Sequence, residues 1–315
     1  MKFCRFLPVW LAVAPVAASA QEEYPRFTGV LEHYLWSIPN QETDRVRHRS
    51  WWAQGTLHLS PMWSVTAGYW TMNGSFFDPV TEMLDENYVK YSTGDADFRF
   101  GRFRKAFGYG DWSEWYSGFV RNPIIRVRTS PQLTANGLTT GADASFPVKG
   151  VGRLQVGVLD ESPEPFQWGP RNMEHVVARL EIPLGPTIVG LNSLSKSGAK
   201  RADRTELYDL DFLLTQPGYQ VKGEYLWGDV GNAKPRGHYL DLYVFPKFDR
   251  RVTLLARHEG FRGPSGDQAM LATTGAKYTL TRDLILEANY SWGSKKGPGA
   301  NNRGWSFQAI TFVRF

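Results

Sequence analysis

The sequence predicts an all-β protein, a closed antiparallel transmembrane β-barrel of about sixteen strands with a long third extracellular loop folded into the lumen. Three observations indicate this fold. Apolar and polar residues alternate with a period of two, in units of about ten residues. The connections between these units alternate between short and long, and the chain ends on an alternating, aromatic strand.

The alternation is clearest in the stretch 284–292. One face of this expected strand carries only leucine, alanine and aromatic side chains, whereas the other carries Glu287 and Asn289 near its centre. The stretches 176–184 and 219–227 behave similarly. A soluble sandwich of two sheets would also cover such apolar faces. Contact with lipid explains in addition why Tyr and Trp gather toward strand ends, as in the aromatic girdles of membrane barrels.

The connections set the strand count. Short links at 60–61, 147–150, 184–186, 216–218, 246–249 and 280–282 alternate with longer polar stretches at 37–47, 73–84, 161–173, 197–204, 229–235, 261–268 and 293–303. The expected strands are 24–36, 47–59, 63–72, 85–93, 96–106, 136–147, 151–160, 174–184, 186–196, 205–215, 218–228, 236–246, 250–260, 269–280, 282–293 and 303–315. An even number of strands puts both ends of the barrel chain on the short-turn, periplasmic side.

The first twenty residues predict export. Two basic residues precede an apolar run and the small residues Ala18-Ser19-Ala20, as in a cleavable signal peptide. A membrane anchor is the alternative, but the apolar run is short and holds two prolines. We therefore expect residues 1–20 to be removed and residues 21–315 to form one outer-membrane barrel domain. Cys4 would leave with the signal, so neither disulfides nor Cys-ligated metals are expected. The formal charge of +5 falls to +3 without the two basic residues, which gives no reason to expect nucleic acid as a partner.

The last expected strand explains the aromatic end of the chain. Alternate positions place Trp305, Phe307, Val313 and Phe315 on one face. A terminal phenylalanine on such a strand resembles the signal read by the machinery that inserts outer-membrane proteins. The same strand can pair with the first one and so leave no open sheet edge.

One segment interrupts the rhythm of strands and turns. After the fifth expected strand, about 27 residues from Gly108 onward contain no clear strand. This stretch holds five aromatic residues and is too apolar to extend freely into water. We expect it to fold inward and narrow the lumen.

The fifth strand itself raises a problem of side-chain direction. Strict alternation would place Arg102 and Arg104 on the lipid face, at a cost of roughly 2–4 kcal/mol each. A one-residue bulge at Gly101 would instead turn these two residues and Arg99 inward, and would leave Phe103 facing lipid.

The run Gly101-Arg-Phe-Arg104, followed by Phe107-Gly108 and the long third loop, resembles the strand-five motif of the phosphate-selective porins O and P. That motif usually reads Gly-Gln-Phe-Lys, then proline, then Phe-Gly, and Ala106 stands at the proline position here. The signal peptide, the strand number and the terminal phenylalanine also match the family. The resemblance implies a homotrimeric, anion-preferring channel for ion transport in a Gram-negative outer membrane, with arginines and lysines at its constriction.

Fixed cations in a narrow aqueous lumen raise the local anion concentration, and the guanidinium fork suits phosphate and carboxylate oxygens. The candidate pore-lining, anion-binding residues are Arg99, Arg102, Arg104, Lys105, Arg121, Arg126, Arg128, Arg179, Lys222 and Arg257, which Arg153 and Lys277 could join. For each strand residue the alternative is a structural pair with a lumen carboxylate, for example Glu181 or Asp241. Asp209 and Asp211 could likewise hold a cation or be ordinary lumen charges.

Other functions stay open as alternatives. Trp112, Trp115 and Tyr116 of the inward loop could stack on pyranose rings, which would favour a sugar-preferring channel. A barrel protease or phospholipase would need an acid pair, or a His with a Ser or Asp, on one wall, but the six histidines are scattered and no G-x-S-x-G turn occurs. A soluble periplasmic sugar-binding sandwich leaves the terminal phenylalanine unexplained.

We expect no enzyme activity, no cofactor and no metal site. The expected partners are small anions or other small polar solutes, together with outer-membrane lipid and lipopolysaccharide, which the basic run 45–49 could contact.

Overall fold

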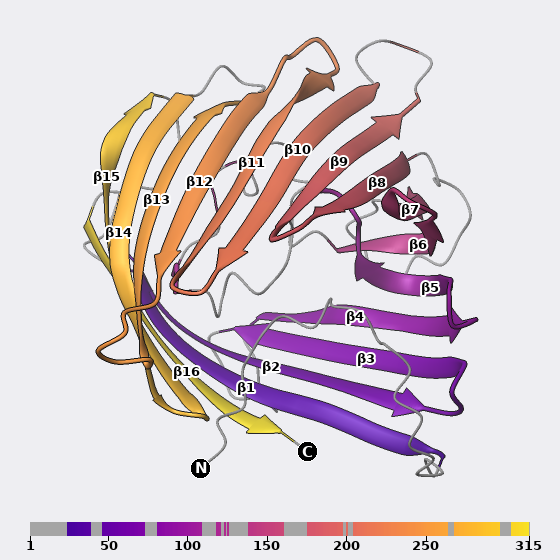
Figure 1. Ribbon diagram of the computed structural model, residues 1–315, viewed down its shortest axis with the longest axis horizontal. Coiled ribbons are helices and arrows are strands. Elements are labelled where there is room, and N and C mark those ends of the chain that lie inside the picture. The colour runs from indigo at the N-terminus through magenta and orange to yellow at the C-terminus, as the bar shows by residue number, and fades with distance from the viewer. Residues whose placement is uncertain are drawn as a thin grey trace.

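The computed structural model describes residues 24–38, 46–72, 81–108, 118–120, 123, 125, 138–160, 175–197, 200, 204–263, 268–296 and 304–314. Within these residues, sixteen antiparallel strands form one closed barrel (Figure 1). The predicted fold class is therefore confirmed. No helix in the described part of the chain is long and apolar enough to cross a membrane.

Each strand pairs with its neighbours in sequence. The first eight are β1 (Arg26–Ile38), β2 (Val46–His58), β3 (Trp63–Met72), β4 (Thr81–Ser92), β5 (Asp97–Arg104), β6 (Leu138–Val148), β7 (Gly152–Asp160) and β8 (His175–Leu184). The second eight are β9 (Thr187–Lys196), β10 (Thr205–Gln216), β11 (Tyr219–Val230), β12 (Arg236–Val244), β13 (Val252–Arg262), β14 (Gln268–Thr281), β15 (Leu284–Lys296) and β16 (Gly304–Arg314). β16 closes the barrel on β1, in a register that runs from Val30 opposite Arg314 to Ser37 opposite Phe307 (Figure 1).

Alternate residues of each strand face opposite sides of the barrel wall. On β10, Asp209 and Asp211 are 1% and 0% exposed, whereas their neighbours Tyr208 and Leu210 are 44% and 42% exposed. The charged residues point into the barrel, and the apolar ones form its outer face. No second sheet covers that outer face among the described residues, since all sixteen strands belong to one ring. A soluble sandwich is thereby excluded, and the exposed leucine, valine and aromatic belt is suited to lipid.

Aromatic side chains pair with each other toward the strand ends. Tyr208 stacks with Trp227, at 5.9 Å between ring centroids, and Tyr290 packs against Trp305 at 5.2 Å. Tyr and Trp are the residues that membrane barrels place at the level of the lipid headgroups. The same residues therefore mark one edge of the apolar belt.

The connections alternate in length as the sequence predicts. Gly150 and Gly185, with φ of 74° and 62°, sit in the tight turns after β6 and β8, where a left-handed backbone favours glycine. In the turn before β13, Arg251 donates hydrogen bonds from its side chain and backbone to Asp249, and these bonds lower the pKa of the Asp249 carboxyl. The longest connection joins β5 to β6.

The bulge expected at Gly101 is not present. Both ladders of β5 run without a shift, from Asp97 to Arg102 against β4 and from Asp97 to Arg104 against β6. The irregularity lies between β3 and β4, where the step from Ala67 to Tyr69 faces the longer step from Asn87 to Leu84. The extra residue therefore belongs to β4.

Phe103 also differs from expectation. It is completely buried among interior apolar side chains and does not face lipid. Arg99 lies on the same face as Phe103, inside the barrel. Arg102 and Arg104 alternate with Phe103 and so start from the face of Phe100, which is 53% exposed, but the Arg104 side chain still reaches the buried Asp85 at the end of the strand. The sequence offered no signal for the bulge in β4, since neither Gly nor Pro marks residues 84–87.

The final strand has the predicted facing. Trp305, Phe307 and Val313 lie on the outer face, and Ile310 and Phe312 lie inside. The predicted role of the terminal residue, Phe315, falls outside the described residues.

The outer face of β10 provides a direct test of lipid contact. Leu210 lies at the middle of the strand, and Gln216 lies at its end with the same parity. We expect Leu210→Arg to destabilise the barrel folded in phospholipid vesicles, lowering its free energy of unfolding by about 2–4 kcal/mol, because a guanidinium would enter the hydrocarbon. Gln216→Arg should cost about 0–1 kcal/mol. Urea titration followed by tryptophan fluorescence measures both, and equal effects at the two positions would contradict the placement of this face.

Candidate functional site

The inner wall of the barrel carries a dense set of charged side chains. The buried carboxylates are Glu32, Asp85, Asp143, Asp209, Asp211, Glu224, Asp241, Glu259 and Glu287. Charges removed from bulk water need partners close by. The question for function is therefore which predicted cations are held by these carboxylates.

Two arginines of β5 are held in this way. Arg99 donates from Nε and Nη2 to the two oxygens of Asp143, at 3.0 and 2.5 Å. Arg104 donates to Asp85, at 2.9 Å, and its Nε lies 3.9 Å from Glu86. The partners Asp143, Asp85 and Glu86 were not anticipated from the sequence. Asp85 and Glu86 are adjacent, and only the irregular register of β4 brings both to the inner wall, where they also bind Trp52 and Gln54 of β2.

Arg179 of β8 is the centre of a second group. It binds Asp211 through both terminal nitrogens and also reaches Asn192 at 2.9 Å and Glu181 at 3.6 Å. Gly190 of β9 leaves the space that this pair occupies, because a Cβ there would collide with both partners. Asn192 further donates to Asp209. The two aspartates are thus engaged with Arg and Asn side chains, which favours ordinary lumen charges over a cation site.

A third group surrounds Asp241 of β12. Arg257 donates to its two oxygens at 2.6 and 2.7 Å, and Lys222 lies 3.8 Å away. Tyr243 donates from its hydroxyl to the same carboxylate. Arg257 is almost fully buried, and the ring of Phe119 lies 4.0 Å from its guanidinium carbon. The prediction of Arg257 as an anion-binding residue is therefore not supported by its surroundings.

Of the remaining predicted cations, Arg102 lies two residues along β5 from the exposed Phe100 and shares its strand parity, and the others divide into two sets. Arg153 binds Asp97 and Ser145, Lys105 is buried inside the barrel, and Lys277 lies opposite Glu287 in the ladder between β14 and β15. Arg121, Arg126, Arg128, Trp112, Trp115 and Tyr116 lie outside the described residues. Among the described residues, no three His, Cys, Asp or Glu side chains are grouped as metal ligands would be.

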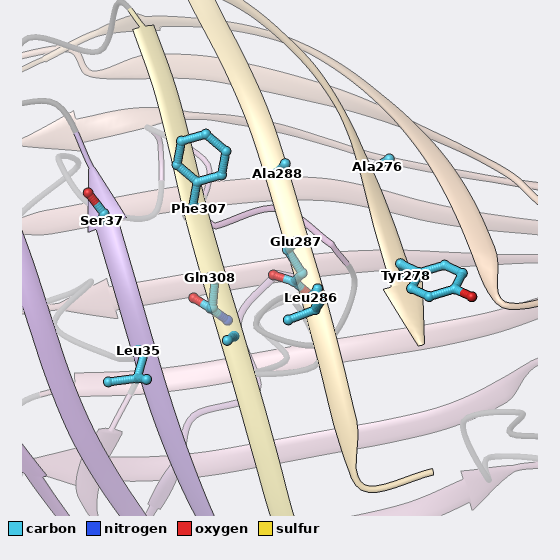
Figure 2. A pocket seen from close by; sticks show the side chains of 10 residues that line it. Leu35, Ser37, Ala276, Tyr278, Leu286, Glu287, Ala288, Phe307 and Gln308 are labelled. Atoms are coloured by element: carbon cyan, nitrogen blue, oxygen red, sulfur yellow. The ribbon is translucent and has the colours of Figure 1, made fainter. Parts of the chain in front are cut away.

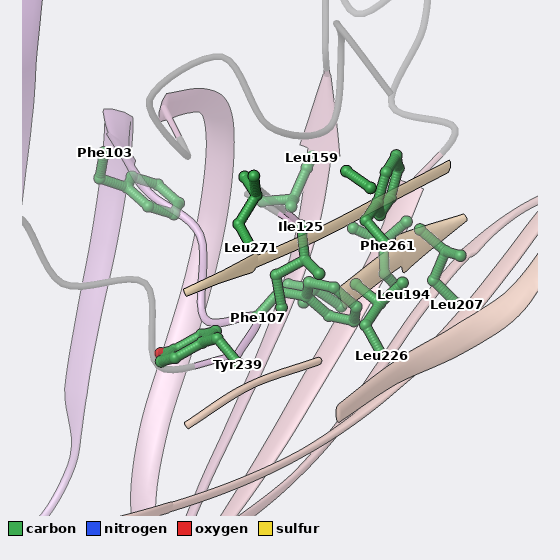
Figure 3. Packing of buried hydrophobic residues seen from close by; sticks show 12 residues of the cluster. Phe103, Phe107, Ile125, Leu159, Leu194, Leu207, Leu226, Tyr239, Phe261 and Leu271 are labelled. Carbon is green, nitrogen blue, oxygen red and sulfur yellow. The ribbon is translucent and has the colours of Figure 1, made fainter. Parts of the chain in front are cut away.

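The segment that follows β5 has contacts inside the barrel. Phe107 and Ile125 join a buried cluster with inward-facing residues of β7 to β14 (Figure 3). The wall members of this cluster are Leu159, Val177, Leu194, Leu207, Leu226, Tyr239, Phe261, Ala269 and Leu271. Ile125 lies over Gly237, where a Cβ would collide with it. These apolar contacts exclude water from one side of the interior.

The same segment is tied to the wall by hydrogen bonds. Arg179 donates to the carbonyl oxygen of Gly108 at 3.1 Å. Asn289 of β15 contacts the backbone of both Gly118 and Val120. The described residues of the segment thus lie against β8 and β12–β15.

A separate groove of about 660 Å³ lies across β14, β15, β16 and β1 (Figure 2). Its lining includes Leu35, Leu286 and Phe307, which are exposed on the outer face of the barrel, and Ala276, Ala288 and Ala309 form its shallow floor. The groove faces the surroundings of the barrel and is not part of the inner site.

The geometry can be compared with known proteins. No protein-family model matches the sequence, and no curated protein is significantly similar to it. Solved structures do match. OmpF of Salmonella typhi, in complex with daunomycin, is 9% identical, with a TM-score of 0.69 over 92% of this chain and 98% of that one. An anion-selective porin from Comamonas acidovorans is 14% identical, with a TM-score of 0.63 over 92% and 98%. The trimer form of OmpT, an outer membrane protein of Vibrio cholerae, is 11% identical, with a TM-score of 0.59 over 92% and 98%.

The fold is similar to that of outer-membrane porins. At these identities the likeness establishes the architecture of the barrel and not the solute. The porin-like fold and the apolar outer belt are those of a transmembrane β-barrel.

The buried pair of Arg257 and Asp241 predicts that replacing Arg257 destabilises the barrel much more than replacing the exposed Arg251. Arg257→Met leaves Asp241 buried without its main partner and should lower the free energy of unfolding by about 3–5 kcal/mol. Arg251→Met removes a pair of similar geometry from an exposed turn and should cause no measurable change. Urea titration in vesicles compares them, and a stable Arg257→Met variant would show that the pair is not needed to neutralise the inner wall.

Proposed function

We propose that this protein is a passive diffusion channel for small hydrophilic solutes in the outer membrane. The observation that supports this most strongly is a closed barrel with an apolar outer belt and a charged inner wall. A protein that only anchored in lipid would have no need of so many buried ion pairs. The expected signal peptide and the porin fold are consistent with this role.

We further propose that the channel prefers small, phosphate-like anions and that the preference arises from the segment between β5 and β6. The described wall arginines are neutralised by Asp143, Asp85, Asp211 and Asp241, so they add little net positive potential. Residues 105–137, in contrast, contain Lys105 and three arginines against Asp111 and Glu114, a net excess of two positive charges. A net excess of fixed charge concentrates ions of opposite sign.

The resemblance to phosphate-selective porins rests on Gly101-Arg-Phe-Arg104 and remains a proposal. The assembly we propose is a homotrimer, by analogy with that family and with the OmpT trimer form. Lipopolysaccharide is the proposed contact of the basic run 45–49, of which Arg49 is exposed.

Two alternative functions would require different side chains inside the barrel. A sugar-preferring channel would use Trp112, Trp115 and Tyr116 as stacking surfaces. A barrel enzyme would need clustered catalytic groups inside the barrel. Among the described histidines, His238 and His258 stack with each other, and the strand parity of their neighbours Tyr239 and Arg257 places them on the outer face. His175 does lie on the inner face of β8, but no three His, Cys, Asp or Glu side chains are grouped together in the part of the chain that the structure describes.

The ion preference is measured as the reversal potential of the purified protein in a planar bilayer under a salt gradient. We expect anion preference, with phosphate and not maltose acting as a blocker. Replacing Arg121, Arg126 and Arg128 together by Gln should reduce the anion-to-cation permeability ratio several-fold, because the segment between β5 and β6 would lose three of the fixed positive charges proposed to attract anions.

The matched control replaces Arg251 and Arg282, two exposed turn arginines, by Gln and should leave the ratio unchanged. Cation preference of the unmodified protein would overturn the anion assignment. Block by maltose would favour the sugar channel, and absence of conductance would overturn the channel itself.

A further inference from the structure

We infer that Asn289 is the positioning residue that fixes the inward segment to the barrel wall and so sets a single width for the aqueous path. This inference rests on the proposed channel function. It concerns the described residues 118–120 and the inner faces of β12 to β15.

The Asn289 side chain holds two backbone groups at once. Its Oδ1 accepts from the Val120 N–H at 2.7 Å, and its Nδ2 donates to the Gly118 carbonyl oxygen at 2.9 Å. Asn289 is buried, and about 170 residues separate it from its partners. A carboxamide is the smallest side chain that offers a donor and an acceptor in one plane. It therefore pairs with the segment as the edge of a neighbouring strand would.

The wall is shaped to let Asn289 take this position. Gly275 of β14 faces Asn289 directly in the ladder. A Cβ at Gly275 would collide with the Asn289 amide nitrogen. The glycine thus leaves the space through which the carboxamide reaches the segment.

The residue between the two hydrogen bonds supplies an apolar contact. The Phe119 ring packs edge-on against Tyr243, at 5.6 Å between centroids, and lies beside Leu255. The same ring covers the guanidinium of Arg257, which Asp241 holds in place. Cation–π contact is stronger where water is excluded, as it is at this buried arginine. Phe119 therefore holds the segment close to the wall, while Asn289 fixes the direction of its backbone.

Both contacts are needed for one defined position. An aromatic ring in an apolar recess can rotate and slide, whereas two hydrogen bonds with fixed geometry cannot be kept in other orientations. In an aqueous lumen the freed backbone groups of the segment would bind water instead, so loss of Asn289 would allow several positions. The cross-section of the path would then fluctuate.

The test compares Asn289→Ala with Asn87→Ala. Asn87 provides a matched control, because its amide also donates to two backbone carbonyls, those of Gly68 and Asp85, but both belong to the barrel wall. Retention of the heat-dependent shift in gel mobility shows that each barrel is folded. We expect the amide of Val120 to exchange with deuterium roughly tenfold faster in Asn289→Ala, since two hydrogen bonds to the segment are lost. Asn289→Asp, which keeps the acceptor and lacks the N–H, should exchange at an intermediate rate.

Single-channel recording supplies the functional readout. Asn289→Ala should increase open-channel current noise and show sub-conductance levels, whereas Asn87→Ala should match the unmodified protein. Unchanged exchange and unchanged noise in Asn289→Ala, or equal changes in both variants, would overturn the positioning role. Absence of conductance in the unmodified protein would overturn the proposed channel, and the exchange result would still decide whether Asn289 holds the segment.

Discussion

The structure depends on one constraint, that a backbone inside hydrocarbon must satisfy its own hydrogen bonds. A flat sheet would leave two edges of unpaired N–H and C=O groups in lipid, and each group would cost several kcal/mol. Pairing of β16 with β1 removes both edges. The closed ladder then forces every strand to show one row of side chains to lipid and the next row to the interior. The apolar belt and the charged lumen are consequences of that single closure.

The charged interior follows a second rule, that buried ions are held in pairs. Arg99, Arg104, Arg179 and Arg257 each bind a carboxylate that is itself deeply buried. Such pairs brace the barrel wall, because three of them join adjacent strands, β5 to β6, β5 to β4 and β13 to β12, and the fourth reaches across β9 from β8 to β10. An arginine that is paired with a carboxylate contributes little net positive electrostatic potential to the lumen.

The inward segment and the wall fit each other through a few small residues. Gly237 makes room for Ile125, and Gly275 makes room for Asn289. The apolar cluster on β7 to β14 gives the segment a dry surface, and the polar contacts at Gly108, Gly118 and Val120 give it an orientation. Hydrophobic burial and directed hydrogen bonds thus both hold the described residues of the segment against the wall. Both are needed, because burial fixes how closely the segment approaches the wall and hydrogen bonding fixes the direction of its backbone.

The sequence by itself determined the barrel, because a period of two is a local property that each strand shows independently. The sixteen strands, their order and the facing of Trp305 and Phe307 could all be predicted in this way. The tertiary structure alone decided which charges are paired, because Asp143 and Arg99 lie 44 residues apart and meet only through strand register. It also moved the irregularity from Gly101 to β4 and turned Phe103 inward, since a bulge depends on how two strands align. The role of Asn289 belongs to the same class, for its partners are distant in the chain and are brought to it by the closure of the barrel.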